Sequence, residues 1–229
     1  MYDALHIPPD IVLDTAANPA DIEARSFAII DTEIPEPRPF DGRLWQVARR
    51  CVHTLGDVDV VRDLRLTENA LERGLAALSS GCTVFTDTRM AADGMPVRRL
   101  APLGVTATPL MALPGIEATA RAQGITRARA AMLDIAPRWA GAIVVVGNAP
   151  TALLTLLDLV AQGMEPPALV IGMPVGFVNA AQSKALLHRS AIPHFTLLGR
   201  KGGSAVAAAC VNAMADMVLA ERDGAEKAI

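Results

Sequence analysis

The chain has 229 residues, of which 52% are hydrophobic, 20% charged and 3% aromatic, and its formal charge is −3. This composition excludes disordered, collagen-like and low-complexity chains, because it provides enough apolar residues for a substantial core. The few aromatic rings and the absence of a basic excess argue against nucleic-acid binding, so any polyanionic ligand must be met locally by arginines and backbone amides.

The sequence predicts a cytoplasmic protein with one domain over residues 1–229. Its three scattered cysteines suit neither a disulfide framework nor a metal site. The N-terminus lacks the pattern of a signal peptide, and the most apolar run, residues 205–220, is broken by polar residues and predicts no membrane span. Residues 1–17 and 221–229 are expected to be tails.

The first third of the chain predicts three helices. The first, over residues 18–34, begins with an N-cap asparagine, a proline and an acid, and ends before a proline-rich breaker. The second, over about residues 42–52, runs into a polar turn at residues 53–57. The third covers residues 67–78 and has Thr67 as its cap.

After residue 80 the pattern changes to short apolar runs, interrupted by one helix expected over residues 115–136. The last three runs each meet a glycine loop and then a helix. The expected strands are residues 82–86, 105–110, 142–146, 168–171 and 195–198.

Three glycines follow the last three strands: Gly147, Gly172 and Gly199, spaced 25 and 27 residues apart. This spacing suits one strand and one crossover helix per unit, and continuous apolar strands indicate a sheet covered on both faces. We therefore predict a three-layer α/β fold with a mainly parallel five-stranded sheet. Right-handed crossovers bring the loops to one edge, so a ligand should bind at the carboxyl ends of the strands.

The segment Gly199–Ser204, with the sequence Gly-Arg-Lys-Gly-Gly-Ser, is the strongest candidate for anion binding. Its glycines let amides approach a ligand, Ser204 can cap the next helix, and two cations lie at the positive end of that helix dipole. A tight turn without a ligand is an equal alternative. The glycine patterns of nucleotide-binding loops follow none of the strands.

Two other loops lie at the same expected edge. Asn148 or Thr151 can cap a helix and aim amides at a ligand, although a purely structural cap is the more frequent role. The loop Pro174–Val178 is apolar, which predicts a slot for an apolar ligand or, equally, packing against the core or a second subunit.

His53 is the candidate general acid, with Thr54 or Asp57 as the residue that orients its imidazole. A simple cap at a helix end is the alternative. The sequence has no paired-carboxylate pattern and no Gly-x-Ser-x-Gly turn, so hydrolysis has no support. Four arginines near the loops can clamp carboxylates or remain surface charges: Arg25, Arg127, Arg129 and Arg200.

In combination these segments resemble the precorrin-8X methylmutase family and its cobalt-precorrin-8 counterpart. The resemblance runs from about Ile22 to Met214, and eight motifs in the right order make it specific. The motifs are Glu23–Phe27, Val52–Asp57, Thr86–Thr88 with Met90 and Gly94, Gly124–Arg127, Gly147–Leu153, Pro174–Val178, Ser183–Lys184 and Gly199–Ser204.

The resemblance implies a flavodoxin-like fold and a homodimer with its site near the subunit interface. It also implies an isomerase of corrin (vitamin B12) synthesis that moves a methyl group from C-11 to C-12 of precorrin-8X or cobalt-precorrin-8. The product is hydrogenobyrinate or its cobalt form, no organic cofactor or metal site is needed, and hand-over to the next pathway enzyme is left open. A polycarboxylate macrocycle needs an apolar slot for its face and cations or amides for its rim.

By motif, the resemblance gives His53 the protonation of a ring nitrogen. The implied substrate contacts are Arg127, Arg200, Lys201, Gly202, Gly203 and Ser204, with Arg25, Ser26, Thr86 and Asp87 as weaker ones and Asn148 added from its loop. Leu55 and Gln182 depart from the family pattern, at positions that affect hydrogen bonding around His53 and an ion pair expected for Lys184.

Two alternatives remain at the level of sequence. A non-catalytic corrinoid binder or carrier would have the same pocket without the chemistry. A nucleotide-dependent Rossmann enzyme is disfavoured because its glycine fingerprint is missing.

Overall fold

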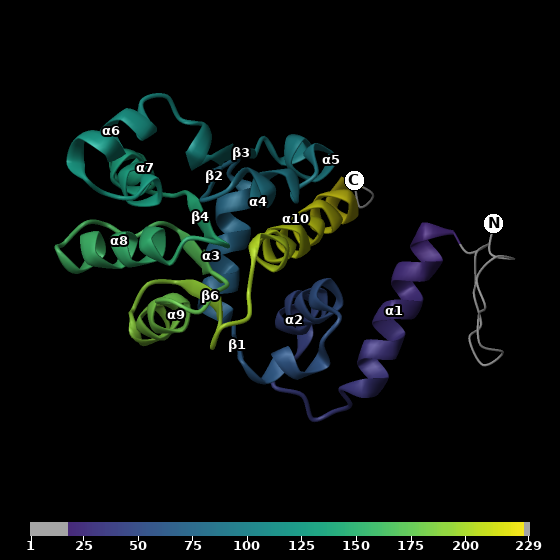
Figure 1. Cartoon of the computed structure of the whole chain (residues 1–229). Coiled ribbons are helices and arrows are strands. Elements are labelled where there is room, and N and C mark those ends of the chain that lie inside the picture. The colour runs from purple at the N-terminus through teal and green to yellow at the C-terminus, as the bar shows by residue number, and fades with distance from the viewer. Residues whose placement is uncertain (1–17, 227–229) are drawn as a thin grey trace, which may run out of the picture.

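A six-stranded sheet between two layers of helices forms the centre of the computed structural model, which describes residues 18–226 (Figure 1). The strands are β1 (Leu64–Arg65), β2 (Thr83–Thr86), β3 (Thr106–Pro109), β4 (Ile143–Val146), β5 (Leu169–Gly172) and β6 (His194–Leu197). The α-helices are α1 (Pro19–Glu33), α2 (Gly42–Leu55), α3 (Glu68–Ser79), α4 (Arg89–Asp93), α5 (Val97–Leu100), α6 (Ile116–Gln123), α7 (Arg127–Ile135), α8 (Pro150–Ala161), α9 (Ala180–Arg189) and α10 (Ser204–Glu226). Short 3-10 helices are η1 (Val58–Arg62), η2 (Ala101–Leu103), η3 (Leu110–Ala112) and η4 (Ala136–Arg138).

The sheet has the strand order β1-β6-β5-β4-β2-β3. Strands β2 to β6 pair in parallel, whereas β1 pairs antiparallel with β6 through Leu64 opposite Leu197 and Arg65 opposite Thr196. The predicted mixed α/β fold is confirmed, but the predicted count of five strands is wrong. The two-residue β1 is too short to produce a periodic signal in the sequence, because a strand normally has about five residues.

The winding of the chain reverses at β2. The chain passes from β2 outward to β3 and then returns to β4 on the other side of β2. Such a reversal opens a crevice at the carboxyl ends of the two diverging strands, where α/β proteins bind ligands. The loops after β2 and β4 are therefore the structural centre of the expected site.

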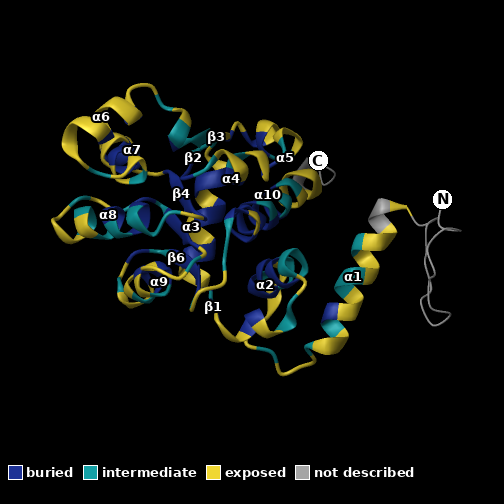
Figure 2. Cartoon of the chain, viewed as in Figure 1, coloured by how far each residue is buried: buried dark blue, intermediate teal, exposed yellow. Residues whose placement is uncertain are grey.

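Residues of β4 show why both faces of the sheet are covered. Ile143 and Val145 join the core under α2, α3 and α10, whereas Val144 and Val146 join the core under α7, α8 and α9. All four side chains are fully buried, and Figure 2 shows β4 in dark blue at the centre of the molecule. Continuous apolar strands are what such a doubly covered sheet requires.

Two predicted helix boundaries are wrong, because in each case a glycine with a positive φ ends a helix at a residue that the sequence pattern did not indicate. The second helix continues to Leu55 and ends where Gly56 adopts a φ of +60°, so His53 lies in its last turn and not in a polar turn. The helix expected over residues 115–136 is two helices, separated by Gly124 at a φ of +62° and restarted by the Thr126 cap.

The C-terminal helix α10 is longer than predicted. It continues to Glu226, so residues 221–226 are helical and not the expected tail, while residues 1–17 lie outside the described part. By length and composition its apolar stretch from Ser204 to Gly224 is long enough to cross a membrane. However, 67% of that stretch is buried inside the protein, as in the core helix of a globular fold.

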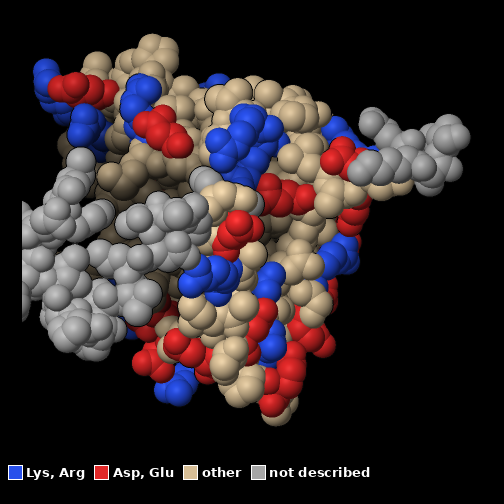
Figure 3. Space-filling view, turned by 90° about the vertical axis from the view of Figure 1, so that its right-hand side faces the viewer, with Lys and Arg blue, Asp and Glu red and all other residues tan. Residues whose placement is uncertain are grey.

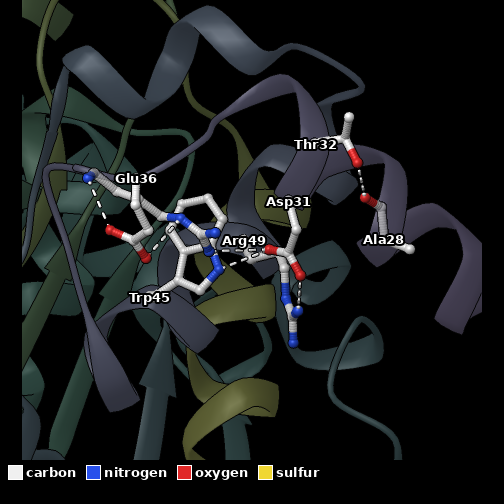
Figure 4. A network of polar contacts seen from close by, with 7 residues as sticks. Ala28, Asp31, Thr32, Glu36, Trp45 and Arg49 are labelled. Atoms are coloured by element: carbon white, nitrogen blue, oxygen red, sulfur yellow. Dashed lines mark hydrogen bonds and ion pairs between the residues drawn. The ribbon is translucent and has the colours of Figure 1, made fainter.

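Helix α1 stands at the periphery and is fastened to α2 by charged side chains (Figure 4). Asp31 accepts a hydrogen bond from Trp45 Nε1 at 2.8 Å and one from Arg49 Nη1 at 2.7 Å. Arg38 Nη1 lies 3.2 Å from the same carboxylate. Much of the outer surface of α1 is exposed (Figure 2), and its attachment combines these polar bonds with the apolar contacts of Phe27 and Ile30 with the core.

Replacing Asp31 with alanine should release α1 without unfolding the sheet. Loss of a part-exposed ion pair costs about 1 kcal/mol or less, which moves the melting temperature of a chain of this size by about 2–4 °C. Trypsin should then cleave within α1 at a higher rate than in the unaltered protein. Glu33→Ala, an exposed change on the same helix, is the control, and equal cleavage rates for the two variants would contradict this attachment.

Candidate functional site

The loops after β5 and β6 interlock at the carboxyl edge of the sheet. Gly203 N donates to Met173 O at 2.9 Å, and Gly176 N donates to Arg200 O at 3.1 Å. A Cβ atom on Gly202 would lie 2.3 Å from Met173 O, so no larger residue fits there. The sequence prediction that these loops meet at one edge is confirmed.

Asp87 fills the crevice between β2 and β4. Its carboxylate accepts hydrogen bonds from Gly147 N at 3.0 Å and from Asn148 N and Ala149 N, both at 2.7 Å. The side chain is 2% exposed, and burial raises the pKa of this carboxyl group, although the three amide bonds oppose the rise. The carboxyl group of Asp87 therefore lies at the positive end of α8 and accepts hydrogen bonds from three successive amides.

The expected side-chain cap of α8 is wrong. The N-cap position is Ala149, and neither Asn148 nor Thr151 caps the helix, because Asp87 already binds the amides of the preceding loop. Asn148 is exposed, so its side chain remains available at the edge. A phosphate at this helix terminus would have to displace the Asp87 carboxylate, which disfavours the nucleotide-binding alternative.

Thr88 and Ser204 join the loop after β2 to the start of α10. Their hydroxyl oxygens lie 2.8 Å apart, and Thr86 Oγ1 supports this loop by donating to Thr88 O at 2.8 Å. A Cβ atom on Gly147 would lie 2.6 Å from Ser204 Cα, so the loop after β4 lies against the same point. Thr86 is fully buried, which suits a supporting role better than direct ligand contact.

The two cations of the Gly199–Ser204 loop have different surroundings. Lys201 is exposed and forms an ion pair with Asp57, from the loop after α2. Arg200 is exposed and its guanidinium carbon lies 5.2 Å from the centre of the Phe177 ring. Phe177 is 80% exposed and Val178 is 78% exposed, so the alternative in which this apolar loop packs on the core is wrong for these two side chains.

His53 lies in the last turn of α2, partly buried, with its ring edge-on to Phe27 at a centroid distance of 5.3 Å. The predicted orienting contacts are wrong. Thr54 Oγ1 donates to Arg50 O at 2.7 Å, and Asp57 binds Lys201 and accepts from Asp59 N at 3.0 Å. Within the described chain, the aromatic contact of His53 is with Phe27 of α1.

His53 lines an open pocket of about 280 Å³ together with residues that sequence reasoning missed. Arg50 pairs with Glu23 and lies 3.5 Å from Asp216, while Arg99 Nε donates to the other oxygen of Asp216 at 2.6 Å. The remaining lining residues are Thr54, Gly94, Ala205, Ala209 and Asn212. The sequence could have indicated Arg50, because a residue one helical turn before His53 lies on the same face of the helix.

Arg127 lies elsewhere on the carboxyl edge. It is the exposed first residue of α7 and lines a pocket of about 460 Å³ that shares no lining residue with the pocket of His53. The preceding Thr126 is within 3.3 Å of Thr151 in the first turn of α8. The structure of one chain therefore does not bring Arg127 and His53 into a common pocket.

Arg25 and Ser26 lie on α1, next to the Phe27 that contacts His53. Arg25 is exposed, and Ser26 Oγ donates to Ile22 O at 2.8 Å. Figure 3 shows acidic and basic side chains interspersed over the face it displays, without a broad field of one sign. An acidic ligand must therefore be bound by local groups, as the composition indicates.

Comparisons with known proteins agree on one family. A sequence model of the precorrin-8X methylmutase family matches residues 21–217. The precorrin-8X methylmutase of Pseudomonas aeruginosa is 40% identical over 85% of this chain and 93% of its own length. The cobalt-precorrin-8 methylmutase of Salmonella typhimurium is 42% identical over 86% and 94%. The crystal structure of a precorrin-8X methyl mutase from Thermus thermophilus has a TM-score of 0.80 and 38% identity, over 87% of this chain and 98% of that one.

Replacing Asp87 with asparagine should destabilise the crevice between β2 and β4. The amide group cannot accept from all three N–H groups, and an unsatisfied buried donor costs about 1–3 kcal/mol. Urea unfolding should show this loss in the free energy of unfolding. Asp158→Asn, an exposed change on α8, should cost less than about 0.5 kcal/mol, and equal losses for both variants would contradict the assigned role.

Proposed function

The chain belongs to the precorrin-8X methylmutase family of isomerases in cobalamin biosynthesis, and we propose that His53 is the general acid of its reaction. The imidazolium donates its proton to a ring nitrogen while a methyl group moves from C-11 to C-12 of the macrocycle, and the macrocycle then releases one proton, which restores the imidazolium, so that the net change is an isomerisation. The migration is intramolecular, so the protein supplies no nucleophile. Its tasks are to place one proton donor and to shape a cavity.

The observation that carries this assignment is the position of His53. It lines an open pocket with Arg50 and Arg99, and Ala205 in the same pocket directly follows the Gly199–Ser204 loop. A proton donor and an anion-binding loop are therefore adjacent. Of the other two histidines in the described part, His188 lies on α9, and His194 is buried with its ring nitrogen 2.7 Å from Ile192 O.

We propose that the carboxylate rim of the substrate is bound by exposed groups around this edge. Arg200, Lys201 and the amides up to Ser204 form one contact region, and Arg127 forms a second. Arg25, Ser26 and Asn148 lie near the rim as further contacts. Asp87 and Thr86 act behind the surface, because both are buried and hold the loops from which these groups project.

The size of the pocket supports a homodimer. About 280 Å³ is below the usual range of about 300–1,000 Å³ for small-molecule sites, so the pocket in one chain can hold only part of a tetrapyrrole. Phe177 and Val178 offer an exposed apolar surface on the loop after β5. We propose that a second copy of the chain closes the open side of this pocket. We also propose that the protein is cytoplasmic and that its fold is flavodoxin-like. Hand-over of the product to the next enzyme is a further expectation.

The cobalt-containing and metal-free substrates both suit this mechanism, because a methyl shift at the periphery requires no protein ligand to the metal. A non-catalytic corrinoid carrier is the alternative function, and it would have the same pocket. The difference between an enzyme and a carrier lies in the role of His53.

Replacing His53 with alanine should abolish turnover and leave binding intact. General acid catalysis contributes about 10²–10⁴-fold to rate, so conversion of precorrin-8X, followed by its absorption change, should fall at least about 100-fold. Binding of the coloured product hydrogenobyrinate should remain within about threefold. His188→Ala serves as the histidine control. Undiminished turnover in His53→Ala would contradict the general-acid role and favour another donor.

Replacing Arg127 with alanine should raise KM for precorrin-8X about tenfold with little change in kcat, because a carboxylate contact is made in both ground and transition states. Arg121→Ala is the matched control, since Arg121 lines the same pocket but pairs with Glu117. Steady-state kinetics of both variants test this contact. An equal rise in KM for the two would indicate a general charge effect and not a specific one.

A further inference from the structure

Lys184 is a buried cation that the proposed mechanism does not use. Its side chain, on α9, has no exposed surface, and no carboxylate of the described chain lies within ion-pair distance of it. Gln182, where an acid was expected as its partner, is exposed. Burying an ammonium group without a paired acid is costly, so the presence of Lys184 at this position calls for an explanation other than stability.

Within the described residues, the side chain of Lys184 makes one hydrogen bond, and it goes to the Gly199–Ser204 loop. Its Nζ donates to Lys201 O at 2.5 Å. That carbonyl belongs to the same peptide group as Gly202 N–H, which makes no hydrogen bond within the described residues. A charged donor on the carbonyl polarises a peptide group and makes its N–H a stronger donor.

The rest of the loop is fixed around this peptide group. Arg200 O accepts from Gly176 N, and Gly203 N donates to Met173 O. The side chain of Lys201 is held by Asp57. The backbone at Gly202 has a φ of +153° and no room for a Cβ atom, so the direction of its N–H is set by the fold.

We propose that Lys184 is a positioning residue for substrate binding, which fixes and polarises the Lys201–Gly202 peptide group so that Gly202 N–H binds a carboxylate of the tetrapyrrole. This inference rests on the proposed function and adds to it the side chain that orients and polarises a peptide group of the Gly199–Ser204 loop. Lys184 itself acts only through that peptide group and is distinct from His53.

The charge of Lys184 makes binding depend on pH. Burial lowers the pKa of Lys184 to about 8, and Asp63 is the one charged group that opposes this shift. On the other elements packed against α9, the titratable groups are Asp158 of α8 and His194 of β6. In the Gly199–Ser204 loop, Lys201 pairs with Asp57, and the guanidinium group of Arg200 lies over the ring of Phe177. As pH rises through about 8, Lys184 loses its charge and carboxylate binding should weaken.

The stability of the fold should change in the opposite direction. The folded-state pKa lies below the ordinary lysine value, so between pH 8 and 10.5 the unfolded chain binds more protons than the folded chain. The contribution of Lys184 to the free energy of unfolding therefore rises over that window. A merely structural lysine would not combine weaker binding with unchanged or greater stability.

The test is Lys184→Met, which keeps the side-chain volume and removes the charge, with Arg189→Met at the exposed end of α9 as control. Binding of hydrogenobyrinate is titrated by absorption at pH 7 and pH 9, with kcat and KM for precorrin-8X and thermal unfolding measured alongside. At pH 7 we expect about tenfold weaker binding and higher KM, kcat within about twofold, and an unfolding temperature that does not fall. At pH 9 the difference in affinity between Lys184→Met and the unaltered protein should be smaller than at pH 7.

Equal affinity of Lys184→Met and the unaltered protein at pH 7 would overturn the inference, as would an affinity ratio that does not change with pH. If Lys184→Met fails to fold, the unaltered protein decides, because a flat affinity between pH 7 and 9 contradicts the role of the charge. Failure of the proposed function is a separate outcome, in which the unaltered protein neither binds hydrogenobyrinate nor converts precorrin-8X.

Discussion

The hydrogen bonds of Asp87 to three successive amides are the constraint on which the arrangement of this site depends. They join the end of β2 to the loop after β4, across the crevice where the winding of the sheet reverses. An internal carboxylate therefore occupies the anion position that many α/β proteins keep for a phosphate. The anion-binding site that we propose lies instead at the Gly199–Ser204 loop after β6, two strand units further along the chain than the loop after β4.

Much of the fold followed from local patterns. The spacing of Gly147, Gly172 and Gly199 predicted the parallel units and the edge at which their loops meet, because both depend on short-range chain geometry. Strand β1 escaped prediction, since two residues that pair only through β6 carry no periodicity. The end of α2 was misplaced because Gly56 stops the helix, whereas His53 and Thr54 read as turn residues.

In the candidate site, too, local patterns could be interpreted from the sequence, whereas contacts between distant elements could not. The sequence proposed His53 and the Gly199–Ser204 loop as site candidates, and both remain predictions. It could not pair Asp57 with Lys201, 144 residues away, nor place Arg99 beside His53. Such contacts depend on how distant elements pack. The chain has a net negative charge and the displayed face carries mixed charges (Figure 3), so in the proposed function a polycarboxylate is bound by single cations and amides at the sheet edge.

One ring contact of His53 comes from the peripheral helix α1. Phe27 belongs to α1, which lies on α2 and is fastened there through the polar bonds of Asp31 (Figure 4). Substitutions in α1 can therefore alter the immediate surroundings of the imidazole without any repacking of the sheet. In a lineage of such enzymes, this peripheral helix offers a place where reactivity can diverge while the architecture is inherited unchanged.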